Sequence, residues 1–216
     1  NNEYIKLYDF NEPGGVSPYG SLTFYNNKLY GMTWAGGTNR VNGVLFSFDL
    51  TNNTYTSLHE FNGTDGKRPY GSLVVYNDQL YGMTNDDDIQ RGGVIFRFDP
   101  ISNTYNKLHT FNGTNGARPR GDLIMYNNQL YGMTERGGLN DRGVIFRFNP
   151  LNNDFAKLYD FIDIDGQRPF GSLLSYSNQL FGMASSGGTN NEGVLFRFDP
   201  NTNTYDKLHN FDGADG

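Results

Sequence analysis

Apolar and polar positions recur along this chain with a period of about fifty residues, through four copies. Met32, Met83, Met133 and Met183 occupy equivalent positions, at spacings of 51, 50 and 50 residues. Each copy holds several short runs of apolar and β-branched residues, separated by clusters rich in Asn and Gly. Helical periodicity is absent throughout, so the pattern predicts short strands joined by turns.

The first copy resolves into four predicted strands. Residues 21–25 and 28–33 flank Asn26 and Asn27, and a two-residue Asn-rich link between apolar runs predicts a type I′ hairpin. Residues 43–48 form the third predicted strand and residues 55–61 the fourth. Later copies place Asp and Pro at the start of the last turn, as in Asp99-Pro100, which suits type I geometry.

Four-stranded units of this length are typical of β-propeller blades. We therefore predict an all-β fold: a β-propeller of four-stranded antiparallel blades, about 50 residues each, in a single domain spanning residues 1–216. The first strand of each blade is expected to be covered on both sides, because Leu73–Tyr76 and its equivalent in the third copy are apolar at consecutive positions. The predicted blades are residues 11–61, 62–111, 112–161 and 162–211.

Two repeat families share features of this pattern. The Asp-Pro-x-x-Asn-Thr-Tyr-x-Lys-Leu segment and glycine pairs such as Gly36-Gly37 resemble kelch-type repeats, although Tyr or Phe stands where kelch blades usually place Trp. The repeat more closely resembles a bacterial repeat family of the Gloeobacter and Verrucomicrobia type. The motifs that carry this resemblance are Gly-Val-Leu-Phe-x-Phe-Asp, Leu-His-x-Phe-Asn-Gly-Thr-Asp-Gly and Pro-Tyr-Gly-Ser-Leu. That resemblance implies propeller blades, often in secreted or surface proteins, and implies no particular activity.

The fourth strand is predicted five times, whereas the other three occur four times each. The surplus copy, residues 4–10, is expected to be an extra outer strand. Three arrangements follow: a closed four-bladed ring latched by a terminal strand, an array belonging to a larger ring, or strand pairing between molecules at an exposed edge.

Composition narrows the classes of partner. The formal net charge is −6, which gives no basic patch for nucleic acid. No apolar run is long enough to span a membrane, and no cysteine is present to form disulfides or thiolate metal sites. We expect no cofactor, and we expect a secreted or cell-surface location.

Candidate binding residues lie in the loops between the second and third strands, where the copies differ most. In an up-and-down blade these loops and the blade-to-blade links emerge on one face, and such loops often carry binding residues. Drift of solvent-exposed loops explains the same variation. The candidate ligand-binding residues are Trp34, Arg40, Asp86, Asp87, Asp88, Arg91, Arg136, Asp141, Arg142 and Glu192.

Several residues carry two interpretations. Trp34 could stack on a sugar ring or a partner side chain, or pack on a neighbouring loop. The run Asp86–Asp88 could hold Ca²⁺ or form a solvated acidic loop. His59, His109 and His209 share one repeat position with Tyr, which favours packing over a metal site. Arg68 and its repeat equivalents favour a structural role over an anion site.

No nucleophile motif, phosphate loop or metalloprotease motif is present, so we expect no enzyme. The leading hypothesis is a non-catalytic module that binds a glycan or protein through its long-loop face. A structural subunit joined by strand exchange at residues 4–10 is the alternative, and a glycan-acting enzyme is the third.

Overall fold

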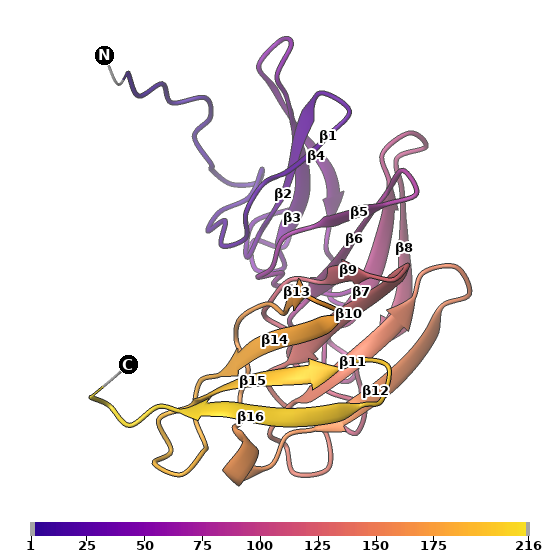
Figure 1. Cartoon of the computed structure of the whole chain (residues 1–216). Coiled ribbons are helices and arrows are strands. Elements are labelled where there is room, and N and C mark those ends of the chain that lie inside the picture. Colours follow the sequence, from indigo (N-terminus) through magenta and orange to yellow (C-terminus); the bar gives the residue numbers. More distant parts are fainter. Residues whose placement is uncertain (1–2, 215–216) are drawn as a thin grey trace.

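The computed structural model describes residues 3–214, and it consists of four antiparallel four-stranded sheets (Figure 1). In each sheet the strands follow one another in chain order, so each is an up-and-down meander. We name the sheets blade 1 (β1–β4), blade 2 (β5–β8), blade 3 (β9–β12) and blade 4 (β13–β16). The all-β propeller-blade architecture predicted from the repeats is therefore confirmed.

Strand lengths repeat from blade to blade. The first strands have three residues, the second and third strands have six, and the fourth strands have seven. In blades 1 and 2 the strands are β1 Thr23–Tyr25, β2 Lys28–Thr33, β3 Val44–Asp49, β4 Thr54–Glu60, β5 Val74–Tyr76, β6 Gln79–Thr84, β7 Val94–Asp99 and β8 Thr104–Thr110. In blades 3 and 4 they are β9 Ile124–Tyr126, β10 Gln129–Thr134, β11 Val144–Asn149, β12 Asp154–Asp160, β13 Leu174–Tyr176, β14 Gln179–Ala184, β15 Val194–Asp199 and β16 Thr204–Asn210, with a short 3₁₀ helix η1 Asp163–Asp165 between blades 3 and 4.

The tight turns follow the predicted chemistry. Asn26 and Asn27 both have positive φ, 46° and 60°, as a type I′ hairpin turn requires. The equivalent pairs in the other blades have positive φ at both positions as well. In the turn between the third and fourth strands the Asp99 carboxylate accepts the N–H of Ile101 at 2.8 Å, and Asn103 takes φ 54°. Short polar side chains that tolerate this backbone therefore fix the strand registers.

The second and third strands are the most buried, which corrects the expectation for the first strands. In blade 2, β6 and β7 are almost wholly buried, whereas β5 is only half-buried and β13 of blade 4 is exposed. The first strands form the short inner edge of each blade. One side of each first strand therefore faces only the edge of the adjacent blade, which leaves its apolar side chains partly exposed. Each fourth strand also carries a bulge that the sequence pattern does not indicate. In blade 2, Ile95 pairs with His109 and Phe96 with Lys107, so the pairing skips Leu108 of β8.

Apolar side chains between adjacent blades form three separate cores. Between blades 1 and 2, Met32 and Phe61 pack against Leu73 and Phe96, all at most 6% exposed. The same positions meet between blades 2 and 3 and between blades 3 and 4. Burial of one such side chain contributes about 1.5–3 kcal/mol, so each core is a substantial part of the stability.

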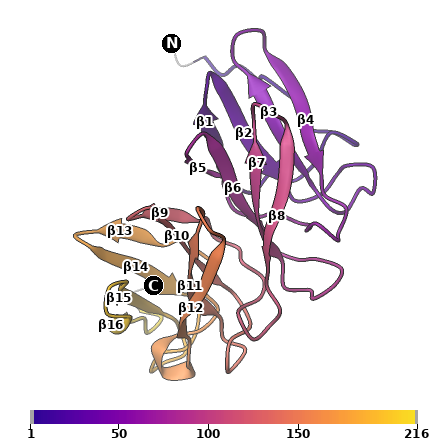
Figure 2. The same ribbon diagram turned by 90° about the vertical axis from the view of Figure 1, so that its right-hand side faces the viewer.

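The four blades form an open arc. Figures 1 and 2 show blade 1 and blade 4 at opposite ends of the molecule, with blades 2 and 3 between them. In the part of the chain that the structure describes, inner strands contact each other from β1 to β5, β5 to β9 and β9 to β13. The closed four-bladed ring, one of the three arrangements open from the sequence, is not the one the chain adopts.

Residues 4–10, expected to be an extra outer strand, form no strand in the structure. A fourth strand pairs with the third strand of its own blade, and no described strand lies beyond blade 1 to receive this segment. Tyr8 and Phe10 nevertheless occupy the positions that a preceding fourth strand would give them. The Tyr8 ring stacks on Tyr55 at 4.1 Å, and the Phe10 ring meets Phe46 edge-on at 5.2 Å.

Candidate ligand-binding face

The blade-to-blade links and the loops between second and third strands lie side by side on one face. Single β-bridges join Lys67 to Asp86, Ala117 to Arg136 and Gln167 to Ser186, each connecting a link to the adjoining loop of the next blade. The bridge from Val16 to Ala35 makes the same connection in blade 1. We call this surface the long-loop face; the tight turns occupy the opposite face.

Arg68, Arg118 and Arg168 organise the long-loop face through their backbones. Each has a φ between 54° and 56°, in the left-handed region. The N–H of Arg68 donates to the Asn42 carbonyl of the preceding blade at 2.7 Å, and its own carbonyl accepts from Asn85. Arg118 and Arg168 repeat both bonds. These contacts agree with the structural interpretation of the three arginines.

A row of rings and one guanidinium follows the inner edge of the long-loop face. Tyr19, Tyr70, Arg120 and Phe170 each precede the glycine that leads into a first strand. Tyr19 stacks on Tyr70 at 5.1 Å, the Arg120 guanidinium lies 5.0 Å from the Tyr70 ring centroid, and 4.9 Å from that of Phe170. We call these four side chains the axial row. It crosses all four blades, and its ends are accessible, with Tyr19 63% and Phe170 42% exposed.

Trp34 and Glu135 flank the axial row. The Trp34 indole meets Tyr70 edge-on at 6.4 Å, and the Arg68 guanidinium lies 5.2 Å from the indole centroid. The buried carboxylate of Glu135 pairs with Arg120 at 2.7 Å. The Trp34 Nε1 atom is buried without a hydrogen-bond partner among the described residues, which is costly for a donor. Aromatic rings, a guanidinium and a free donor thus converge at this edge.

Among the residues expected at the site, Asp86 and Asp88 form a local ion-pair cluster in blade 2. Lys67 Nζ lies 2.5 Å from Asp88 Oδ1 and 3.7 Å from Asp86 Oδ2, and Arg68 lies 3.8 Å from Asp86. Two of the three carboxylates in the acidic run are therefore neutralised by neighbouring cations.

Asp87 is not available to a ligand, which corrects its place among the expected binding residues. It is fully buried, and its carboxylate accepts the backbone N–H groups of Gln90 and Gly92 at 3.0–3.2 Å. Blade 2 has Asp87-Asp88 at the position where the other blades have a glycine pair in this loop. In blade 3 the carboxylate that accepts a backbone N–H of this loop belongs to Asp141, which accepts the Gly137 N–H at 2.8 Å. Asp87 therefore holds its own loop in shape.

The remaining expected residues are spread over the arc, and their contacts are local. Arg136 pairs with Asp141 at 3.3 Å, and Arg142 with Asp163 at 2.5 Å. Arg40 pairs with Glu12 at 3.2 Å. Arg91 is exposed in blade 2, and Glu192 is exposed in blade 4. These side chains lie on the long-loop face as expected, but they do not gather into one pocket. Of the ten, Trp34 lies beside the axial row.

The axial row is the feature that sequence reasoning missed. Its four positions lie inside the repeated Pro-x-Gly motif, where Pro and Gly are fixed and the middle residue changes from Tyr to Arg to Phe. Variation at one position of an otherwise constant motif was the available signal. The motif alone does not indicate a site, because only the fold brings the four positions together.

The histidines share one packing position. His59 stacks on Tyr105 at 3.9 Å and His109 on Phe155 at 3.9 Å, where Tyr8 and Tyr159 stack in the other copies. Burial lowers the pKa of His109 to about 4. Within residues 3–214, no three His, Asp or Glu side chains gather closely enough to hold a metal ion.

The blade repeat, the three equivalent cores and the loop face define a protein of the propeller-repeat class. The model of the Gloeobacter/Verrucomicrobia repeat matches residues 1–92 and 67–216. The chain therefore belongs to the Gloeobacter/Verrucomicrobia repeat family. None of the curated proteins matches the sequence.

Solved structures share the fold at low sequence identity. TolB from Acinetobacter baumannii aligns with a TM-score of 0.54 and 13% identity, over 84% of this chain and 40% of TolB. The extracellular domain of the putative hybrid two component system BT4673 from B. thetaiotaomicron aligns with a TM-score of 0.62 and 14% identity, over 96% of this chain and 24% of that one. A puromycin-hydrolyzing peptidase from Mycobacterium tuberculosis aligns with a TM-score of 0.56 and 12% identity, over 90% and 29%.

This chain thus spans less than half the length of each of these structures. Across the described residues, the fold contains no helix with the length and apolar character needed to cross a membrane.

Proposed function

We propose that the protein is a non-catalytic, secreted or surface-displayed binding module that recognises a glycan or protein ligand on its long-loop face. The observation that carries this proposal is the axial row of Tyr19, Tyr70, Arg120 and Phe170, with Trp34 beside it. Tyr, Trp and Arg are the side chains that dominate recognition surfaces, because each combines a large contact area with a polar or charged group.

The rigidity of the row supports a recognition role. Each ring stands next to an inner strand and stacks on its neighbour, so little side-chain entropy remains to be lost on binding. The accessible rings of the row are its ends, since Tyr19 is 63% exposed and Phe170 is 42% exposed. Either a sugar ring or a peptide side chain could stack on such a ring.

The states of the buried carboxylates support the non-catalytic part of the proposal. Glu135 and Asp87 are at most 5% exposed. Glu135 is paired with Arg120, and the Asp87 carboxylate is engaged by backbone N–H groups of its own loop. Hydrolysis of a glycoside by the usual route needs two carboxyl groups facing each other across a cleft, and these two are committed elsewhere.

An oligosaccharide array and a displayed peptide library test the proposal and separate the two ligand classes. The labelled protein should bind members of one of them. The double variant Tyr19→Ala/Phe170→Ala removes the accessible ends of the axial row and should weaken that binding at least about tenfold.

Leu151→Ala is the matched control, because Leu151 is 69% exposed on a tight turn of the opposite face. It should leave binding unchanged. Absence of binding in both screens, or equal binding by the row variant and the native protein, would refute the proposal.

A further inference from the structure

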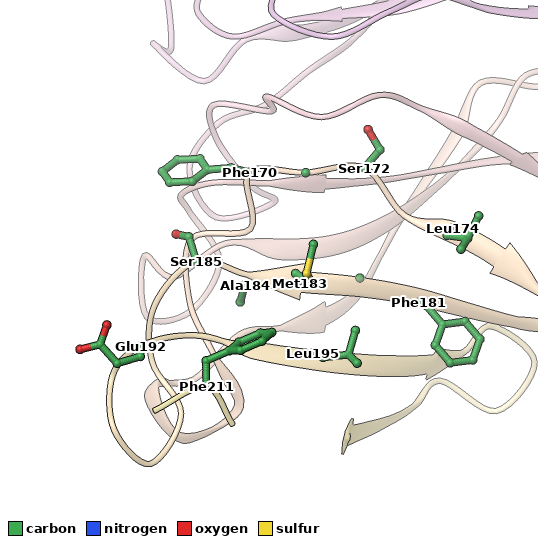
Figure 3. A pocket seen from close by; sticks show the side chains of 12 residues that line it. Phe170, Ser172, Leu174, Phe181, Met183, Ala184, Ser185, Glu192, Leu195 and Phe211 are labelled. Carbon is green, nitrogen blue, oxygen red and sulfur yellow. The ribbon is translucent and has the colours of Figure 1, made fainter. Parts of the chain in front are cut away.

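The two ends of the arc leave two different blade faces uncovered. We call the face formed by Phe181, Met183, Leu195 and Phe211 the leading face of blade 4, shown in Figure 3. Met183 is 57% exposed, whereas its equivalents Met32, Met83 and Met133 are 3–4% exposed against the next blade. At the other end Leu22 of blade 1 is 54% exposed, whereas its equivalents Leu73, Leu123 and Leu173 are 3–6% exposed.

These two faces are the two halves of an interface that the chain forms three times internally. At each internal boundary a Met and a Phe of one blade, such as Met32 and Phe61, pack on a Leu and a Phe of the next, such as Leu73 and Phe96. Met183 and Phe211 repeat the first half, and Leu22 and Phe46 repeat the second. The chain therefore carries its own complementary surface for each exposed end.

A row of glycines at the inner edge gives independent evidence that blade 1 and blade 4 have complementary surfaces. A Cβ on Gly20 would lie 2.4 Å from the carbonyl oxygen of Gly71, one on Gly71 would lie 2.5 Å from Gly121, and one on Gly121 would lie 2.2 Å from Gly171. A Cβ on Gly171 would meet nothing within 4 Å. Gly171 thus has the small size that close packing against another blade requires, but no blade of the single molecule packs against it.

A series of hydrogen bonds across the blade boundaries also stops at blade 4. The Ser21 N–H donates to Ser72 Oγ at 2.8 Å, and the Asp122 N–H donates to Ser172 Oγ at 2.8 Å. The Ser172 N–H stands at the end of this series, and Ser21 Oγ stands at its start. A blade 1 placed on blade 4 would bring these two groups together.

We propose that the leading face of blade 4 binds blade 1 of a second copy of this chain, head to tail. The contact reproduces the internal blade boundary, with Met183 and Phe211 on Leu22 and Phe46 of the second copy. Because the two surfaces differ, the association is heterologous, and it gives either a closed ring or a filament.

The segment that covers part of blade 1 regulates this association. Tyr8 and Phe10 stack where His209 and Phe211 of the incoming blade would lie, since His59 and Phe61 hold those places at the first internal boundary. The segment and the second copy therefore compete for one surface. This reverses the expectation of strand exchange, in which residues 4–10 join the molecules.

Sedimentation velocity over a wide range of protein concentration tests the association. The native chain should form dimers or longer species as concentration rises. Gly171→Ala should weaken the association at least about tenfold without lowering the melting temperature of the single molecule, because its Cβ lies in open space there. Gly121→Ala is the contrasting variant, since its Cβ would strike a neighbouring blade within the molecule and lower the melting temperature.

Tyr8→Ala/Phe10→Ala distinguishes competition from strand exchange. Competition predicts that the double variant associates more tightly, whereas strand exchange predicts weaker association. Ile101→Ala is the control, because Ile101 is 80% exposed on a turn outside both faces.

Engineered cysteines test the polarity, since the chain has none of its own. A mixture of Ser21→Cys and Ser172→Cys molecules should form disulfide-linked pairs, and neither variant alone should do so. A monomer at every concentration, cross-links within either single variant, or association insensitive to Gly171→Ala would overturn the proposal.

Discussion

Equivalent positions of the repeats hold different residues, because the fold constrains the shape of the side chain there and not its chemistry. One stacking position falls on the fourth strand in three copies and at Tyr8 in the N-terminal segment. It accepts His or Tyr, and its partner accepts Tyr or Phe, with interplanar angles of 3–4° in all four stacks. A flat ring satisfies the contact whatever its chemistry. Where the ring is a histidine, however, its titration changes the stability of the folded state.

His109 makes the folded state sensitive to acid. Burial lowers its folded pKa to about 4, against about 6.5 when unfolded, so below pH 6.5 the unfolded chain binds a proton that the folded one does not. Stability is fully present above pH 6.5, and about 2–3 kcal/mol is lost as the pH falls to 4. His109→Tyr, which copies Tyr159, should remove this part of the loss in urea titrations at pH 7 and pH 4.

Ile101→Ser, on an exposed turn of the same blade, is the control and should keep the native pH dependence. An equal loss of stability in the His109→Tyr variant would show that other groups cause the acid sensitivity.

A second prediction at this scale concerns Asp87. Asp87→Ala leaves the N–H groups of Gln90 and Gly92 without their acceptor in a buried loop, and should destabilise the fold by about 2–3 kcal/mol. Asp88→Ala removes a 54% exposed carboxylate next to it and should cost less than about 1 kcal/mol. Thermal melting of both variants checks the difference, and equal melting temperatures would contradict it.

At the scale of elements, the sequence predicts strands and tight turns well because both depend on local chemistry. The Asn26-Asn27 turn and its equivalents have the positive φ that their residues permit. The relative burial of strands was not predictable in this way, because burial depends on which edge of a blade faces its neighbour. The first strands are as apolar as the third, yet their place at the inner edge leaves them half-exposed.

The candidate site was only partly predictable for the same reason. Trp34 drew attention as the only tryptophan, and the structure places it beside the axial row. Tyr19, Tyr70, Arg120 and Phe170 lie about fifty residues apart in the sequence, and nothing local relates them. Their contact follows from the stacking of blades, which is a property of the whole molecule.

At the scale of the whole molecule, the fold is a short linear array in which each blade contacts its immediate neighbours. Stability in such arrays is close to a sum of blade terms and boundary terms. Blades 2 and 3 have two boundaries, whereas blades 1 and 4 have one. The sequence could not predict whether the array closes, because every internal boundary has the same residues as the one that closure would need.

Hydrogen exchange should follow the number of boundaries. In the Gly171→Ala variant, which is expected to stay a single molecule, amides of β15 should exchange at least about tenfold faster than those of β7 and β11. The reason is that Leu195 lies on an uncovered face, whereas Ile95 and Ile145 are fully buried. Equal protection across the three strands would indicate that the four blades unfold as one unit.

The equivalence of the three blade boundaries also bears on how such a chain changes over generations. Because each blade presents the surface that the next one accepts, a gene duplication of one repeat would insert a blade that fits both of its neighbours at once. No compensating substitution in the core is needed for the longer protein to fold. Blade number can therefore drift freely, while the loops of the long-loop face diverge copy by copy.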